Sequence, residues 1–353
     1  MDPSNVNNKR AAFSGSIMRK DAAVAKVINN SVQDVTESAP IYIKNYMDFP
    51  EWLKDRGADL TRSNMRVILK KLGIPAHDAV AAVKYANAAS LTDEFWIKPQ
   101  DSALTYEDTV FKNNLYFKAA ASGDPDIFGI TAKQTPELTN IGSFEKGWKL
   151  ENGKWFLYKS GNPLQRFSEI FASALARLLG LDAVEYWVKD GFVVCENFVR
   201  PGYCLELAKS FIWDDLDYRR NAEWMHENGF LRQYMDLIFT DVIVRNADRH
   251  EFNYGVLTSA AGIVSLAPNF DNNLSLFHNG IPSNLSRDDI FVSDFNNALD
   301  YARRRFAFKY TLPPLAEGLV REAFSYAVSS APVEVPENSV VSFCMNAFNR
   351  INK

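Results

Sequence analysis

The sequence predicts an α+β protein in which a small lobe built around a β-sheet precedes a mainly helical lobe. Residues 154–198 read as strand, helix and two further strands, and two long apolar helices follow at 229–244 and 315–328. With 353 residues and 47% apolar content, the chain can bury the core of one large or two medium domains.

We expect four segments along the chain. Residues 1–38 are small and polar and predict a flexible leader, and residues 39–130 predict a small, mainly helical N-terminal unit. The β-rich lobe is expected at 131–200 and the helical lobe at 201–353. The prediction of a helical N-terminal unit rests on two segments. Apolar residues recur at helical spacing at 65–72, and a second short helix is expected at 77–89.

The β-rich lobe is predicted from a strand at 154–159, a helix at 167–179, and a hairpin. The hairpin joins 184–188 to 192–198 through an Asp-Gly turn. In the helical lobe, the loop after the 229–244 helix leads into short strands at 254–257 and 263–267. This ribbon is expected to bring the loops at its two ends side by side.

Composition narrows the classes of function. The net charge of −4 with mixed signs does not favour direct nucleic-acid binding or an anionic membrane surface. Three unpaired cysteines give neither a disulfide framework nor a zinc site. The sequence has no apolar run of about 18 residues and no signal-peptide core, so we expect a cytoplasmic protein without a membrane span.

Residues 244–255 read Val-Arg-Asn-Ala-Asp-Arg-His-Glu-Phe-Asn-Tyr-Gly. In phosphoryl transfer, one carboxylate accepts the proton of the attacking hydroxyl, while an amide oxygen and a second carboxylate hold a divalent metal. Asp248 is the expected proton acceptor, and Asn253 and Asp271 are the expected ligands of Mg²⁺. Such residues are also common in ordinary loops, because they bond their own backbone. His250 is expected to brace the loop.

Three further segments could hold a nucleotide. Lys159 ends a strand ten residues before Glu169, a pairing that presents an ammonium to phosphates, although solvated Lys–Glu pairs are common. The turn between Gly142 and Gly147 could lay amides on phosphates or merely connect strands. Glu196-Asn-Phe198 could contact an adenine edge or simply leave the sheet.

These motifs resemble those of the HipA-like protein kinases, whose catalytic loop has the form Asn-x-Asp-Arg-His-x-x-Asn-[Phe/Trp/Tyr]-Gly. The chain has the matching residues in that loop, and Ala267-Pro268-x-Phe-Asp271 matches the family's metal motif. The resemblance covers about residues 135–350. The loop residues that match are Asn246, Asp248, Arg249, His250, Asn253, Tyr254 and Gly255.

The resemblance implies a bilobed protein-kinase-like fold, ATP with Mg²⁺, and serine/threonine phosphorylation of a protein, often within a bacterial toxin–antitoxin pair. It places Asp248, Arg249 and His250 in the catalytic set. It also implies a phosphate loop that can be autophosphorylated, for which Thr139 and Ser143 are the available hydroxyls. The residues that it assigns to nucleotide binding are Gly142, Ser143, Phe144, Glu145, Lys146, Lys159, Glu169, Glu196 and Phe198.

Residues 1–130 do not match the small β-rich domain that precedes the kinase core in HipA, but they could bind an antitoxin or a regulatory protein. Two alternatives stay open. One is a small-molecule or lipid kinase on the same fold, although the segment 272–294 is polar with Arg287 as its one cation, which favours a soluble substrate. The other is a non-catalytic interaction module.

Overall fold

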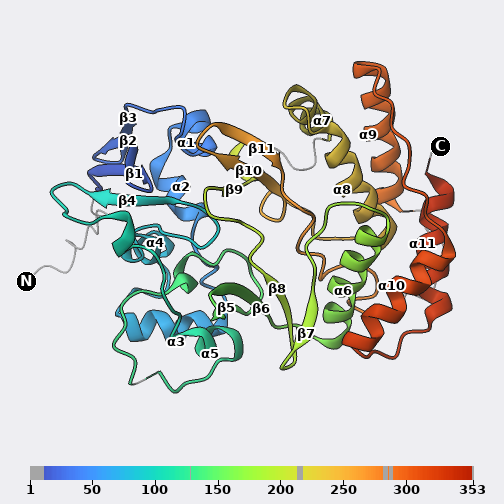
Figure 1. Ribbon diagram of the computed structural model, residues 1–353, viewed down its shortest axis with the longest axis horizontal. Helices are drawn as coiled ribbons and strands as arrows, with labels where there is room; N and C mark the ends of the chain where they lie inside the picture. The colour runs from blue at the N-terminus through green and yellow to red at the C-terminus, as the bar shows by residue number, and fades with distance from the viewer. Residues whose placement is uncertain (1–11, 128, 213–217, 281–284, 286–288, 352–353) are drawn as a thin grey trace, which may run out of the picture. The chain divides into compact units, whose positions relative to one another are not determined.

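The computed structural model describes residues 12–127, 129–212, 218–280, 285 and 289–351 (Figure 1). The protein is a mixed α+β chain that forms two compact units. The first comprises Met1–Ser143, Val199–Glu206 and Thr258–Ile263, and the second comprises Phe144–Phe198, Leu207–Leu257 and Val264–Lys353. In the described part of the chain, no helix has both the length and the apolarity needed to span a bilayer.

A four-stranded antiparallel sheet in the order β3-β2-β1-β4 opens the first unit. In its central strands Ile17 lies between Ala25 and Ile97, and Val24 and Val27 point into the same core. The strands are β1 (Gly15–Arg19), β2 (Ala22–Ile28), β3 (Ser31–Gln33) and β4 (Phe95–Pro99).

The expected flexible leader at 1–38 is therefore wrong for the part of it that the structure describes, and residues 1–11 lie outside the described residues. These strands are short, and their buried side chains do not alternate regularly along the chain. Their register is completed by β4, more than sixty residues further along the chain. Short strands of this kind show only a weak alternating pattern in the sequence, because their burial depends on the partner strands.

Among the described residues of the first unit, five segments form short α-helices. Asp48 and Asp78 cap α2 and α4 with their carboxylates, and Gly73 ends α3 in the left-handed conformation at φ 71°. The helices are α1 (Ile41–Tyr46), α2 (Phe49–Asp55), α3 (Ser63–Leu72), α4 (Ala79–Tyr85) and α5 (Phe117–Ser122), with 3₁₀ turns η1 (Tyr106–Asp108) and η2 (Pro136–Thr139).

The second unit begins with an antiparallel sheet in the order β5-β6-β8-β7. Strand β6 spans the residues predicted for it, and the predicted hairpin is present as β7 and β8. The strands are β5 (Lys146–Glu151), β6 (Lys154–Lys159), β7 (Trp187–Lys189) and β8 (Phe192–Glu196).

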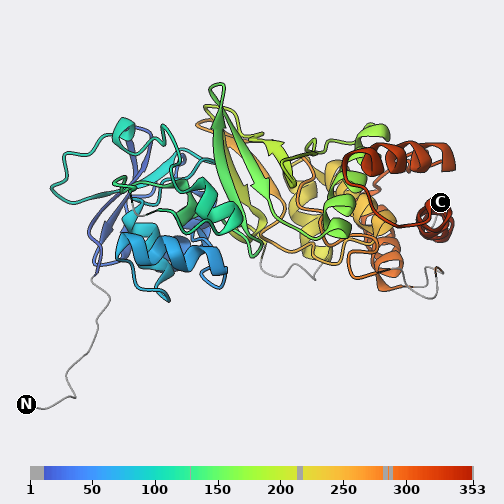
Figure 2. The same cartoon turned by 90° about the horizontal axis from the view of Figure 1, so that it is seen from below.

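Helix α6 (Pro163–Leu178) follows β6 and starts four residues earlier than predicted. Asn162 and Gln165 form a capping box around its first turn, and Pro163 takes the first helical position. Its buried face contains Phe167, Ile170 and Phe171. This face packs against α10 (Glu317–Ser330), and the two helices lie side by side in Figures 1 and 2.

The remaining helices are α7 (Tyr218–Glu227), α8 (Leu231–Val244), α9 (Ile290–Phe306) and α11 (Glu337–Arg350). Helix α8 is buried along most of its length and contacts α7, α9 and α11. A third sheet has the order β11-β10-β9, with the short turn η3 (Ala208–Ser210) after β9. Its strands are β9 (Cys204–Leu207), β10 (Gly255–Ser259) and β11 (Gly262–Leu266).

Candidate active site

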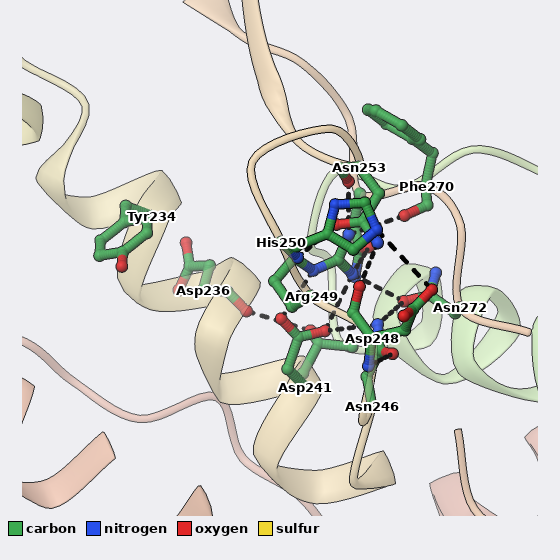
Figure 3. A network of polar contacts seen from close by, with 12 residues as sticks. Tyr234, Asp236, Asp241, Asn246, Asp248, Arg249, His250, Asn253, Phe270 and Asn272 are labelled. Atoms are coloured by element: carbon green, nitrogen blue, oxygen red, sulfur yellow. Dashed lines mark hydrogen bonds and ion pairs between the residues drawn. The ribbon is translucent and has the colours of Figure 1, made fainter. Parts of the chain in front are cut away.

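The loop at 246–253 connects α8 to β10 and is shaped by its own side-chain amides (Figure 3). Arg245 ends α8 in the left-handed conformation, at φ 51°. The Oδ1 atom of Asn246 accepts a hydrogen bond from Asp248 N at 3.1 Å, and Oδ1 of Asn253 accepts one from His250 N at 2.9 Å. The Nδ2 group of Asn253 donates to the Asp248 carbonyl. Asp248 therefore sits in a turn with two amide braces.

Arg249 lies at the centre of the polar network in Figure 3, and its side chain is buried. Its Nε and Nη2 groups donate to the two carboxylate oxygens of Asp241, on α8, at 2.8 and 2.9 Å. This is a bidentate ion pair, the strongest geometry for arginine and carboxylate.

The same guanidinium joins the 246–253 loop to the loop that follows β11. Its Nη1 group donates to the carbonyls of Asn253 and Phe270 at 2.6 and 2.8 Å. Its Nη2 group also donates to the Oδ1 atoms of Asn269 and Asn272, both at 2.9 Å. These contacts make Arg249 a group that positions the two loops, and each of its nitrogens is engaged within the protein.

Asp271 occupies the left-handed region at φ 61°. Its Oδ1 atom accepts a hydrogen bond from Lys159 Nζ at 2.8 Å, and the next backbone amide, Asn272 N, donates to Glu169 Oε1 at 2.9 Å. Burial alone would raise the pKa of Asp271, but Lys159 and Lys146 hold that pKa well below its usual value. Asp271 is therefore an ionised carboxylate.

Lys159 also forms an ion pair with Glu169, on α6, at 3.2 Å, so one ammonium contacts two carboxylates. Burial alone would lower the pKa of Lys159, but Asp271 and Glu169 hold it well above its usual value. Glu169 lies in the second turn of α6. The predicted Lys159–Glu169 pair is present and buried, so the solvated pair considered as an alternative is excluded.

Lys146 is the cross-strand partner of Lys159 and is also buried. Directly paired residues of an antiparallel ladder project from the same face of the sheet. Two ammonium groups therefore lie on the face that Asp271 approaches. Such a pair is suited to a polyanion such as a triphosphate.

The carboxylate of Asp248 lies close enough to Asp271 to interact with it. Burial raises the pKa of Asp248, and the Asp271 carboxylate raises it further, while His250 acts in the opposite direction. His250 Nε2 is 3.9 Å from Asp248 Oδ2, and His250 Nδ1 accepts a hydrogen bond from Phe252 N at 3.1 Å. His250 contacts both the loop and its aspartate, as a bracing residue would.

The segment proposed to contact an adenine edge lies at the end of β8. Glu196 is half-exposed and forms an ion pair with Lys154 at 2.9 Å. Phe198 packs on Phe270, the residue before Asp271, with ring centroids 5.6 Å apart. Their nucleotide role stays a prediction.

In the predicted phosphate loop, Gly142 has φ 113° and Ser143 is exposed. Gly142 and Ser143 belong to the first unit, whereas Phe144, Glu145 and Lys146 belong to the second, so the chain passes between the units within this loop. Lys146 is the first residue of β5, and the carbonyl of Glu145 accepts a hydrogen bond from Ser160 N at 2.9 Å.

The two hydroxyls considered for autophosphorylation differ in accessibility. Thr139 is buried in the first unit, and its Oγ1 donates to the carbonyl of Ala89 at 2.7 Å. Ser143 is exposed. Of these two residues, Ser143 therefore offers the accessible hydroxyl in this conformation.

Sequence reasoning missed the residues that hold the two loops together, namely Asp241, Asn269 and Asn272. Asp241 carried one usable signal, because an acidic residue inside an apolar helix needs a buried partner. Asn269 and Asn272 flank Asp271 and looked like ordinary loop residues. Their role depends on the guanidinium of Arg249, whose position the local sequence does not specify.

Among the residues that the structure describes, no three His, Cys, Asp or Glu side chains gather into a metal-binding group. A closed protein cage of the zinc type is thus not built from those residues. Mg²⁺ has a smaller requirement, since it binds through one or two carboxylates together with waters and substrate phosphates. Asp271 is one such carboxylate, and with the amide oxygen of Asn253 it stays the predicted ligand pair for Mg²⁺.

No protein-family model matches the sequence, and no curated protein sequence matches it either. Among solved structures, the chain is similar to HipA of Shewanella oneidensis MR-1, determined in a toxin–antitoxin complex with HipB and operator DNA. The TM-score is 0.53 at 12% identity, with 96% of both chains covered. The proinflammatory kinase CtkA of Helicobacter pylori gives a TM-score of 0.42 at 16% identity, with 58% of this chain and 90% of that chain covered.

The HipA similarity shows the fold, which is kinase-like as the motifs predicted. It extends through nearly the whole chain, so it also includes residues of the N-terminal unit. The β3-β2-β1-β4 sheet, which the sequence did not predict, lies in this region.

Proposed function

We propose that this protein is an ATP- and Mg²⁺-dependent serine/threonine protein kinase of the HipA type, with Asp248 as proton acceptor. The observation that carries the proposal is the double contact of Lys159, which reaches Glu169 at 3.2 Å and Asp271 at 2.8 Å. A lysine held by a helix glutamate beside a metal-binding aspartate is the arrangement that protein kinases use. The kinase-like fold supports the same conclusion.

The donor set fits a magnesium–nucleotide complex. Asp271 is ionised, and its contact with Lys159 uses one of its two carboxylate oxygens, Oδ1. The amide oxygen of Asn253 is a second candidate ligand, although it also accepts a hydrogen bond from His250 N. When bound, Mg²⁺ would neutralise charge on the phosphates and orient them for in-line transfer.

The other residues of the site have separate proposed roles. Lys159 and Lys146 would bind phosphate oxygens, while Asp248 would accept the proton of the attacking hydroxyl. Burial raises the pKa of Asp248 and thereby makes it a stronger base than an exposed aspartate. Arg249 holds the loops that carry Asp248 and Asp271. Gly142, Ser143, Phe144 and Glu145 would cover the phosphates, and Glu196 and Phe198 would contact the adenine.

The proposed substrate is a hydroxyl group of another protein. The similar HipA of Shewanella oneidensis was determined together with HipB and operator DNA. By analogy, residues 1–130 are the proposed contact surface for an antitoxin or regulatory protein in a toxin–antitoxin pair, and the cytoplasm is the proposed location. Ser143 is the proposed site of autophosphorylation, because its hydroxyl is exposed.

Radiolabelled ATP tests the proposal directly. Wild-type protein incubated with Mg²⁺ and a cell extract should transfer label to protein, and Asp248→Asn and Asp271→Asn should abolish transfer while both variants stay folded. Asp300→Asn is the matched control, since Asp300 is a half-exposed aspartate on α9 outside the site. Label in small molecules alone would favour the small-molecule or lipid kinase.

Nucleotide binding separates an enzyme from an interaction module. A hundredfold excess of ATP over its dissociation constant stabilises a binding protein by about 2.7 kcal/mol, which a thermal-shift measurement detects. No shift with ATP and Mg²⁺ would contradict the kinase proposal and favour the interaction module.

A further inference from the structure

We infer that Tyr186 is a positioning residue of this site, and that its hydroxyl and its ring together fix Asp271 and Lys159. This inference rests on the proposed function. Tyr186 lies just before β7, 85 residues from Asp271 in sequence, and its side chain is buried. No motif of the sequence points to it.

The segment that contains Tyr186 runs parallel to the loop that contains Asp271. Asn269 N donates to the carbonyl of Asp182 at 2.9 Å, and Val184 N donates to the carbonyl of Asn269 at 3.0 Å. Ala183 and Asn269 form a parallel β-bridge. The segment 182–186 is therefore attached to the metal-binding loop through its backbone, and this places Tyr186 level with Asp271.

The Tyr186 hydroxyl completes this attachment. Its oxygen accepts a hydrogen bond from Asp271 N at 3.4 Å. Asp271 has φ 61°, so the chain leaves the extended conformation at this residue. The hydroxyl supplies the acceptor that the backbone of a neighbouring strand would otherwise provide, and so supports the left-handed conformation at the metal-binding position.

The ring of Tyr186 contacts Lys159, the ion-pair partner of Asp271. Lys159 Nζ lies 5.1 Å from the ring centroid, within the range of a cation–π interaction. A tyrosine ring attracts an ammonium without neutralising it, so the charge of Lys159 stays available to phosphates. The far side of the residue is also held, since Tyr326 on α10 donates its hydroxyl to the Tyr186 carbonyl at 3.5 Å.

Two substitutions separate the roles of hydroxyl and ring. Tyr186→Phe keeps the ring and leaves Asp271 N without its acceptor. We expect the Mg²⁺ concentration for half-maximal nucleotide binding to rise about fivefold, the change expected for one neutral hydrogen bond. The turnover at saturating Mg²⁺ should stay close to that of the wild type. Tyr186→Leu also removes the cation–π contact, and it should weaken ATP binding even at saturating Mg²⁺.

Tyr158→Phe is the matched control. Tyr158 is a buried tyrosine of β6. Lys149 Nζ lies 5.3 Å from its ring centroid, and its hydroxyl donates to Glu151 Oε1 at 3.0 Å. This substitution removes a buried tyrosine hydroxyl, as Tyr186→Phe does. The contacts described for Tyr158 involve none of the proposed site residues. Its Mg²⁺ dependence should equal that of the wild type.

The experiment is a calorimetric Mg²⁺ titration of binding of a non-hydrolysable ATP analogue to the full chain. A raised Mg²⁺ requirement in Tyr186→Phe, with none in Tyr158→Phe, supports the positioning role. Equal Mg²⁺ dependence of wild type and Tyr186→Phe overturns the inference and leaves the kinase proposal intact. If the wild type shows no Mg²⁺-dependent nucleotide binding, the proposed function fails, and the role of Tyr186 fails with it.

Discussion

The guanidinium of Arg249 binds both carboxylate oxygens of Asp241, at 2.8 and 2.9 Å, while its remaining donors reach the loops around Asp248 and Asp271. Both partners are almost fully buried. The ion pair is thus the link between a helix of the second unit and the two loops that carry the proposed catalytic carboxylates.

Removal of one partner of the Arg249–Asp241 ion pair should lower the free energy of unfolding. Asp241→Ala leaves a buried guanidinium without its counter-charge, a change that destabilises proteins by about 3–5 kcal/mol. Denaturant unfolding measures this. The control is Glu185→Ala, which breaks the half-exposed pair of Glu185 with Arg177 and should cost at most about 1 kcal/mol. Similar costs in both variants would show that the Arg249 pair has no special structural role.

Lys159→Ala should weaken ATP binding and lower turnover together, because a charged hydrogen bond to phosphate is lost. Such bonds contribute about 1.5–3 kcal/mol, so the KM for ATP should rise by about tenfold to a hundredfold. Lys154→Ala is the control at the other end of β6, where the lysine is 60% exposed and pairs with Glu196. Steady-state kinetics measures both variants. An unchanged ATP affinity in Lys159→Ala would argue against its phosphate role.

Stability of the first unit should fall as the pH rises from about 4.5 to about 7. Glu206 is buried, accepts hydrogen bonds from Ile41 N at 2.5 Å and Thr258 Oγ1 at 3.0 Å, and burial raises its pKa from 4.5 to about 7. In this window the folded protein binds more protons than the unfolded chain. The free energy of unfolding therefore decreases with pH, by up to about 3 kcal/mol.

The variant Glu206→Gln removes that titration while keeping a carbonyl acceptor for Ile41 N. Denaturant unfolding at pH 5 and pH 7.5 should show a smaller decrease in the variant than in the wild type. The exposed Glu37 provides the control, since Glu37→Gln should leave the pH dependence as it is. Parallel pH profiles for wild type and Glu206→Gln would contradict the prediction.

The proposed autophosphorylation should modify Ser143 and spare Thr139. The hydroxyl of Thr139 is buried and donates to the Ala89 carbonyl, whereas Ser143 is exposed. Mass spectrometry of protein incubated with ATP and Mg²⁺ identifies the site, and Ser143→Ala should remove the phosphate. Phosphate on Thr139 would mean that the turn η2 opens.

The local parts of the site were predictable from the sequence, because their signals lie within single elements. The aromatic strand at 154–159 and the apolar helix α8 were confirmed by the structure, and so was the pairing of Lys159 with Glu169, ten residues apart. Spacing allowed this pairing beside a solvated alternative, and the fold decided between the two by burying both side chains.

The other parts of the fold and of the site depend on long-range contacts, which spacing in the sequence does not reveal. The strands β1–β3 acquire their buried face only through β4, and Asp241 acquires its role only through Arg249 and the asparagines beyond β11. Tyr186 is a further example, because its partners Lys159 and Asp271 come from segments on either side of it in sequence. Such long-range groupings appear only once the chain is folded.

The loop at 246–253 is held in shape by contacts within the protein. Asn246 and Asn253 cap its turns, and Arg249 fastens it to α8. The conformational entropy of ordering this segment is consequently lost once, during folding, rather than at each encounter with nucleotide.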